Sequence, residues 1–187
     1  MHYRLATSLP ELAAYMRRFH EIAGTDGWHR RAKQLERDAR NVYDIKIVAD
    51  YHWLETSIGP HSLLADGMGH LVSNDFDLRE LSAMYFAGGI VEIFDRLTPF
   101  GQRVLKGRIR DCLKNETGFA PLHLEVEMAQ RLLENGFDVE FSDMEGAGQC
   151  DLRFQNETMR GEVEWKSLSA DAGRKIHRKD HCCSVKS

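Results

Sequence analysis

The chain has 187 residues, of which 42% are hydrophobic and 29% are charged, and its net charge is −4. This composition is typical of a soluble globular protein with one ordinary domain or two small ones, and it gives no overall attraction for nucleic acid. No apolar run is long enough to span a membrane. The four cysteines form no Cys-x-x-Cys pair, which excludes a disulfide framework and predicts a cytoplasmic protein.

Residues 1–115 predict a helical region in which we find no catalytic motif. Periodic apolar stripes, capping residues and prolines predict helices over about residues 10–23, 28–42, 78–97 and 99–114. The segment 45–58 is ambiguous, because its isoleucines and valine favour a short strand while Tyr51-His52-Trp53-Leu54 favours a helical turn. Gly88-Gly89 lies inside a predicted helix and indicates close packing or a break.

From residue 116 onward the pattern changes to that of an α/β region. A helix over about residues 121–134 leads into a strand near residues 137–141. Two further strands are predicted at residues 149–154 and 161–166, joined by a polar segment that is short enough for a hairpin. Another helix is predicted to begin near residue 170. We therefore divide the chain into a helical region, residues 1–115, and an α/β region, residues 116–187.

Acidic residues and a lysine converge on the last two predicted strands. Side chains two residues apart on a strand point to the same face, so Glu162, Glu164 and Lys166 share one face. Asp151 lies on the neighbouring strand. Carboxylates and a lysine in one small volume can hold Mg²⁺ against a phosphate and orient an attacking water.

The same residues also fit a set of exposed cross-strand charges that carry no chemistry. Against this interpretation, Val163 and Trp165 give the strand an apolar opposite face, so its charged face must meet something polar. Basic charge also gathers here, since residues 160–187 contain seven Lys/Arg and four Asp/Glu. A phosphate backbone would lie at this place, although a solvated basic helix explains the same charge.

The order helix, strand, strand, strand, helix, with acids at these positions, resembles the PD-(D/E)XK nuclease superfamily over roughly residues 119–180. Asp151, in Gln-Cys-Asp-Leu-Arg-Phe, matches the family's aspartate on the second strand, and Glu164-Trp165-Lys166 matches the Glu-x-Lys on the third. The segment 124–137 is similar to the first helix of archaeal Holliday-junction resolvases. The resemblance implies an α/β fold (a mixed sheet in an α+β arrangement) with a restriction-endonuclease-like α-β-β-β-α core.

The resemblance also implies a metal site and a catalytic lysine. Asp151, Glu164 and the main-chain carbonyl of Trp165 would bind Mg²⁺, for which Mn²⁺ could substitute. The metal would lower the pKa of a bound water and stabilise charge on the phosphate. Lys166 would orient or activate the attacking water, or neutralise the charge of the transition state.

The family also has an acid on its first helix, and two glutamates are candidates for it. Glu125 shares the apolar, sheet-facing stripe of this helix, whereas Glu127 is expected on the solvent side. Burying an unpaired carboxylate is unfavourable unless a site requires it, so we choose Glu125 and keep Glu127 as the alternative. Arg174 and Lys175, on the following helix, would contact flanking phosphates.

The end of the chain departs from the family pattern. The family core continues with a full helix and a fourth strand, but residues 176–187 contain no further apolar strand. Either the sequence is a fragment, or the N-terminal region or a partner chain completes the sheet. An exposed sheet edge invites pairing, which predicts a homodimer or a heterologous partner.

We therefore expect a cytoplasmic, metal-dependent nuclease that hydrolyses phosphodiester bonds of nucleic acid, with DNA favoured over RNA and no membrane association. The sequence does not show whether the nucleic acid is single- or double-stranded, which base sequence is preferred or which pathway the protein serves. One alternative is a catalytically inactive nucleic-acid-binding module with the same fold. A second alternative is a protein-interaction domain built on the helical region.

Overall fold

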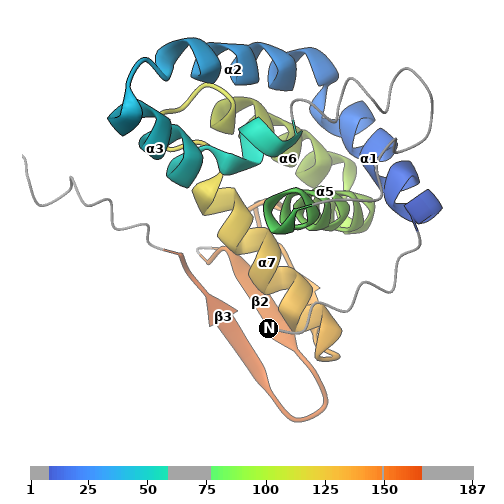
Figure 1. Ribbon diagram of the computed structural model, residues 1–187. Helices are drawn as coiled ribbons and strands as arrows, with labels where there is room; N and C mark the ends of the chain where they lie inside the picture. Colours follow the sequence, from blue (N-terminus) through green and yellow to red (C-terminus); the bar gives the residue numbers. More distant parts are fainter. Residues whose placement is uncertain (1–8, 59–76, 149, 166–187) are drawn as a thin grey trace, which may run out of the picture.

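The computed structural model describes residues 9–58, 77–148 and 150–165. These residues form a mostly helical protein with a small three-stranded antiparallel sheet at the C-terminal side, which is a mixed α+β arrangement (Figure 1). Among the helices described, none is both long enough and apolar enough to cross a membrane.

The helical region agrees largely with the prediction. The helices are α1 (Leu9–Ala23), α2 (Thr25–Asp38), α3 (Val42–Tyr51), α5 (Leu78–Arg96), α6 (Pro99–Cys112) and α7 (Ala120–Glu134). Asp77 and Glu80 form a complete capping box at the start of α5, and the Thr98 hydroxyl caps α6 ahead of its proline. Helix α2 begins earlier than predicted because Gly24, at φ 78°, makes the turn from α1 alone.

The ambiguous segment is helical, so the strand considered for it is wrong. Helix α3 covers most of it, and residues 53–58 are helical as well. The Asn41 side chain accepts hydrogen bonds from the backbone N–H groups of Tyr43 and Asp44, which is a strong N-terminal cap. Capping thus prevails over the β propensity of the isoleucines and valine, which is a weak preference.

The sheet has the strand order β1-β2-β3 and is a simple meander. Its strands are β1 (Asp138–Glu140), β2 (Leu152–Gln155) and β3 (Arg160–Val163). The predicted hairpin is confirmed, with Leu152 opposite Val163 and with Asn156 Oδ1 accepting from the backbone of the turn. Its strands are shorter than predicted, because β2 begins after Asp151 and β3 ends before Glu164, so neither acid lies on a strand. All strand pairs that the structure describes are antiparallel, so the mixed sheet predicted from the resemblance is not seen in them. The helix predicted near residue 170 lies outside the described residues.

One hydrophobic core includes side chains from both predicted regions. The indole of Trp28, on α2, stacks on the ring of Phe119, just before α7, with centroids 4.5 Å apart. Helices α5 and α7 approach closely at Gly89, where an added Cβ would lie 2.6 Å from the Val126 side chain. Gly89 therefore explains the close packing that the Gly-Gly pair indicates, while Gly88 has open space around it.

Helix α7 connects this core to the sheet. It packs on α5 through Val126 and Ala129, and it lies across the sheet in Figure 1. Leu152 is buried in the same core, and Val139 and Val163 pack against it, so these residues form the inner face of the sheet. Helix α7 and the sheet therefore pack together through apolar side chains.

We expect Phe119→Ala to lower the free energy of unfolding by about 3–5 kcal/mol, because a fully buried ring is removed and a cavity remains. Since the ring belongs to a core that both regions share, the variant should still unfold in a single transition. Urea denaturation followed by circular dichroism measures both quantities. Phe100→Ala, at a ring that is 50% exposed, is the control. A loss below about 1 kcal/mol for Phe119→Ala would contradict the shared core.

Candidate functional site

Glu125 lies on the buried side of α7, as its position in the apolar stripe predicts. Glu125 is only 9% exposed to solvent. Its Oε2 atom accepts a hydrogen bond from Nη1 of Arg108 on α6 at 2.5 Å. The other terminal nitrogen of Arg108, Nη2, binds the carboxylate of Asp143 in the turn after β1. One guanidinium thus joins two carboxylates that are 18 residues apart in the sequence.

The turn that carries Asp143 is fixed to α6 at a second place. Glu145 accepts hydrogen bonds from the backbone N–H of Thr98, at 2.8 Å, and from the Thr98 hydroxyl. Thr98 is the residue that caps α6. Glu145 therefore contacts the beginning of α6, and Asp143 contacts Arg108 further along the same helix. The second contact orients the Arg108 guanidinium between this turn and Glu125 of α7.

Asp151 lies where the β2–β3 ladder ends. Its backbone N–H donates to the Val163 carbonyl at 3.0 Å, and its Oδ2 accepts from the backbone N–H of Trp165 at 2.6 Å. The side chain thus replaces a main-chain partner at the end of β3. This contact places the Asp151 carboxylate beside the backbone of the Glu164-Trp165 pair, which brings two parts of the predicted motif together.

The charges of Arg108, Asp143 and Asp151 all act on the carboxyl group of Glu125. Burial raises the pKa of its carboxyl above the ordinary value for glutamic acid, and the charge and hydrogen bond of Arg108 act against this rise. The negative charges of Asp151 and Asp143 raise the pKa further. The carboxylates of Asp151, just before β2, and of Asp143, in the turn after β1, therefore both lie close enough to act on Glu125 of α7.

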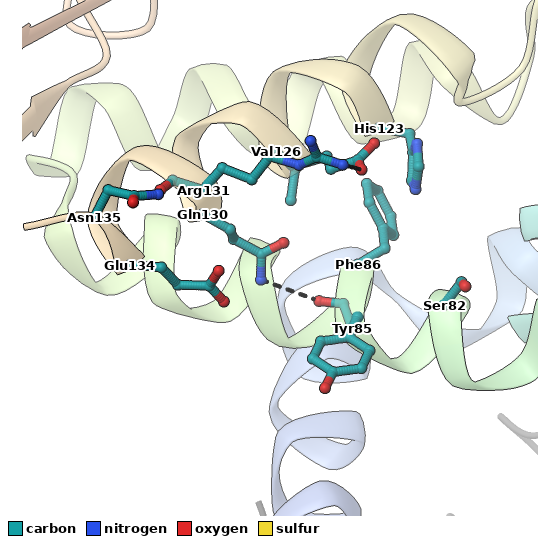
Figure 2. A pocket seen from close by; sticks show the side chains of 10 residues that line it. Ser82, Tyr85, Phe86, His123, Val126, Gln130, Arg131, Glu134 and Asn135 are labelled. Atoms are coloured by element: carbon teal, nitrogen blue, oxygen red, sulfur yellow. Dashed lines mark hydrogen bonds and ion pairs between the residues drawn. The ribbon is translucent and has the colours of Figure 1, made fainter. Parts of the chain in front are cut away.

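Glu127, the alternative acid on α7, lies in a different place. It lines a cavity of about 330 Å³ between α5 and α7, together with Arg131, which donates to it at 2.5 Å. Figure 2 shows side chains from both helices around this cavity, with Gln130 reaching the Tyr85 carbonyl oxygen. Glu127 is half-buried rather than on the solvent side, which corrects the expectation for it. Of the two glutamates, Glu125 is the one in the cluster with Asp151.

The charged face of the hairpin contains at least one ordinary cross-strand pair. Arg153 and Glu162 are register partners, and Arg153 Nε donates to Glu162 Oε1 at 3.1 Å. Glu164 is exposed, and Val163 and Trp165 are half-buried, so the predicted alternation of charged and apolar faces is confirmed. Glu162 therefore fits the interpretation as an exposed structural charge.

The donor set fits magnesium by chemistry, although it is sparse. The described residues contain no group of three or more His, Cys, Asp or Glu side chains placed to hold a metal. Asp151, Glu164 and the Trp165 carbonyl supply oxygen ligands, and Mg²⁺ keeps several waters and needs few protein groups. Lys166, Arg174 and Lys175 lie outside the described residues, so their predicted roles stay predictions.

Two residues of this cluster were not predicted from the sequence. Arg108 belongs to the region in which no catalytic motif was found, and Asp143 lies in the turn after β1. A signal for Arg108 exists, since it follows buried Leu105 by three residues and precedes half-buried Cys112 by four. An arginine at the edge of an apolar stripe is stabilised by a carboxylate partner, although the sequence does not say which one.

Comparisons with protein-family models, with curated proteins and with solved structures find no match for this chain.

We expect Arg108→Met to lower the free energy of unfolding by about 1.5–3 kcal/mol at neutral pH, because Glu125 loses its charged hydrogen-bond donor. Without Arg108 the pKa of Glu125 should rise further, since the factor that lowers it is removed. A raised carboxyl pKa means that the native state keeps a proton that the unfolded state has lost. The deficit of the variant should therefore be smallest at low pH and grow as the pH rises through the native-state pKa values of Glu125 in wild type and variant, which both lie above the ordinary value.

Urea denaturation from pH 4 to pH 8 measures this pH dependence. Arg103→Met is the matched control on α6, because Arg103 is exposed and the contact observed for it is with the Phe100 ring, 5.9 Å away. The control should change stability little and without a pH trend. A deficit of Arg108→Met that stays constant over this pH range would contradict the role of Glu125 as its partner.

Proposed function

We propose that this protein is a metal-dependent nuclease, with DNA favoured over RNA as its substrate. The observation that carries the proposal is the placement of Asp151. Its carboxylate caps the end of β3 beside Glu164-Trp165, and its charge acts on the buried Glu125 of α7. An acid of α7 and an acid just before β2 thus lie near each other, beside the backbone that follows β3 and leads in sequence to Lys166.

Asp151, Glu164 and the Trp165 carbonyl would hold the Mg²⁺ ion. When bound, this ion supplies a more acidic water and stabilises negative charge on a phosphate. Lys166 follows Trp165 directly, so its ammonium can orient the attacking water or neutralise charge that develops on the phosphate. The Asp151 side chain already accepts a hydrogen bond from the backbone of Trp165, which orients its carboxylate toward the end of β3.

Arg108 and Glu125 have a positioning role in this proposal. Oε2 of Glu125 is bound to Arg108, so its other oxygen, Oε1, is the atom that could hold a water or a metal-bound water. The guanidinium of Arg108 also offsets part of the negative charge that Glu125 and Asp143 bring to the site. This lowers the repulsion that a phosphate would meet from the acids.

An inactive module that binds nucleic acid is the second candidate. Two observations favour it, namely the lack of a three-member metal cluster among the described residues and the engagement of Glu125 by Arg108. Such a module would bind DNA with a steep dependence on salt and would not cleave it. Measurements of binding and cleavage on the same samples distinguish the two candidates.

We expect the protein to cleave plasmid or linear DNA in Mg²⁺ or Mn²⁺ and not in EDTA. Asp151→Asn and Lys166→Ala should each lower the cleavage rate by about 100-fold or more, because the first removes a metal ligand and the second removes the cation at the reacting phosphate. Glu127→Gln is the matched control, since it neutralises a glutamate of α7 that lines the cavity between α5 and α7 instead of the proposed metal site. It should retain cleavage within about twofold of wild type.

Single-stranded DNA and RNA substrates in the same assay show which nucleic acid is preferred. Cleavage that persists in Asp151→Asn and Lys166→Ala would show that the activity has another origin and would overturn the proposed site. Binding without cleavage, under any of the metal conditions, would support the inactive module instead.

A further inference from the structure

A second cluster of charge lies on the other side of α6 and has no role in the site above. A cavity of about 790 Å³ opens between the α1–α2 turn and the end of α6. Its lining contains four arginine and lysine side chains, the buried His20 and one carboxylate, that of Asp26. The arginines and the lysine are Arg30, Arg31, Arg110 and Lys114. This concentration of positive charge is unusual in a chain whose net charge is −4.

Arg31 is the residue that points to a ligand. It is only 8% exposed and lies on the buried stripe of α2 between Trp28 and Leu35. Within the described part of the chain, its guanidinium makes one hydrogen bond, from Nη2 to the Asn115 carbonyl oxygen at 3.0 Å. Its Nε atom is buried without a partner, and no carboxylate is paired with it there. A buried guanidinium that lacks a counter-charge is unfavourable, and an anion in the cavity would supply one.

The other walls of the cavity suit an oxyanion. The first turn of α2, at Thr25, Asp26 and Gly27, lines it, and no side chain among the described residues caps this helix. The unsatisfied N–H groups and the positive end of the helix dipole attract anions. Arg30 and Arg110 are exposed at the cavity, so a ligand can reach their guanidinium groups from solvent.

This cavity is separate from the carboxylate site. Arg108 and Arg110 are two residues apart on α6, so they project about 200° apart around its axis. Arg108 faces Glu125 and Asp143, whereas Arg110 faces the α1–α2 turn. A phosphate bound at Arg31 is therefore not the phosphate at the proposed metal site, and binding there does not require the cleavage proposed above.

We propose that this cavity binds a phosphate group, with Arg31 at its base, Arg30, Arg110 and Lys114 at its rim, and the first turn of α2 on one side. Phosphate oxygens accept charge-assisted hydrogen bonds from arginine in pairs, which suits three guanidinium groups around one cavity. The phosphate can belong to a free ligand, such as a nucleotide, or to the backbone of a nucleic acid.

Calorimetric titration of the full chain in EDTA, at constant ionic strength, tests the proposal. The probes are pyrophosphate, a nucleoside triphosphate and a short DNA duplex. In Arg31→Met and in the double variant Arg110→Ser/Lys114→Ser, the dissociation constant should rise about tenfold or more, because charge-assisted contacts are lost. The double variant changes only exposed residues and should not disturb folding. Arg37→Ser, which removes an exposed arginine of α2 outside the cavity, is the control.

Tight binding of the small phosphates that is lost in both variants supports a site for a free phosphorylated ligand. Binding of the duplex alone, lost in the same variants, supports a contact to a nucleic-acid backbone. If no probe binds wild type, or if the variants bind as tightly as Arg37→Ser, the proposal is overturned.

The melting temperature of Arg31→Met in chloride buffer is a second check. It should equal or exceed that of wild type, because the buried charge has been removed, and a lower value would show that the charge is already compensated.

Discussion

The contact between α7 and the sheet depends on the charge of Arg108. Glu125 is buried on the side of α7 that faces the sheet, and a carboxylate in that position requires a cation. Arg108 supplies the cation from a helix of the N-terminal region, and its second hydrogen bond holds the turn after β1 through Asp143. The same arginine therefore orients Glu125 of α7 and holds the turn between β1 and β2. In this way it joins the helical region to the α/β region.

Packing fixes where this ion pair lies. Gly89 lets α5 approach α7, and the Trp28–Phe119 stack holds the start of α7 against α2. These contacts give α7 one position over the sheet, so Glu125 is brought near Asp151 by the core and not by attraction between acids, which repel. Burial first, and then repulsion from Asp151 and Asp143, raises the pKa of Glu125. Clusters of this kind are more frequent at functional sites than elsewhere, because folding alone does not favour them.

The sequence predicts the local features well, because they depend on neighbouring residues. The helices that begin at Leu78 and Pro99, the hairpin at Asn156 and the inward face of Glu125 are all confirmed. Partnerships between distant residues were not predictable, because periodicity shows that a side chain is buried without showing what it meets. Arg108 was missed for this reason.

The second cavity illustrates the same limit. The sequence predicts a helix in place of α2, and no local signal joins it to the end of α6. The fold brings Arg30 and Arg31 together with Arg110 and Lys114. If both sites bind phosphate, α6 lies between them, with Arg108 on one side and Arg110 on the other. The helical region then has a role in binding as well as in supporting the sheet.

The most direct test of the central claim is a titration of the isotope-labelled protein with substoichiometric Mn²⁺, followed by NMR. The account predicts that the backbone amides of Asp151, Val163 and Trp165 broaden first, and that this selective broadening disappears in Asp151→Asn. Such a result would establish a metal site at the end of the β2–β3 ladder without any assay of cleavage. Broadening that is absent, diffuse or centred on another part of the chain would contradict the account.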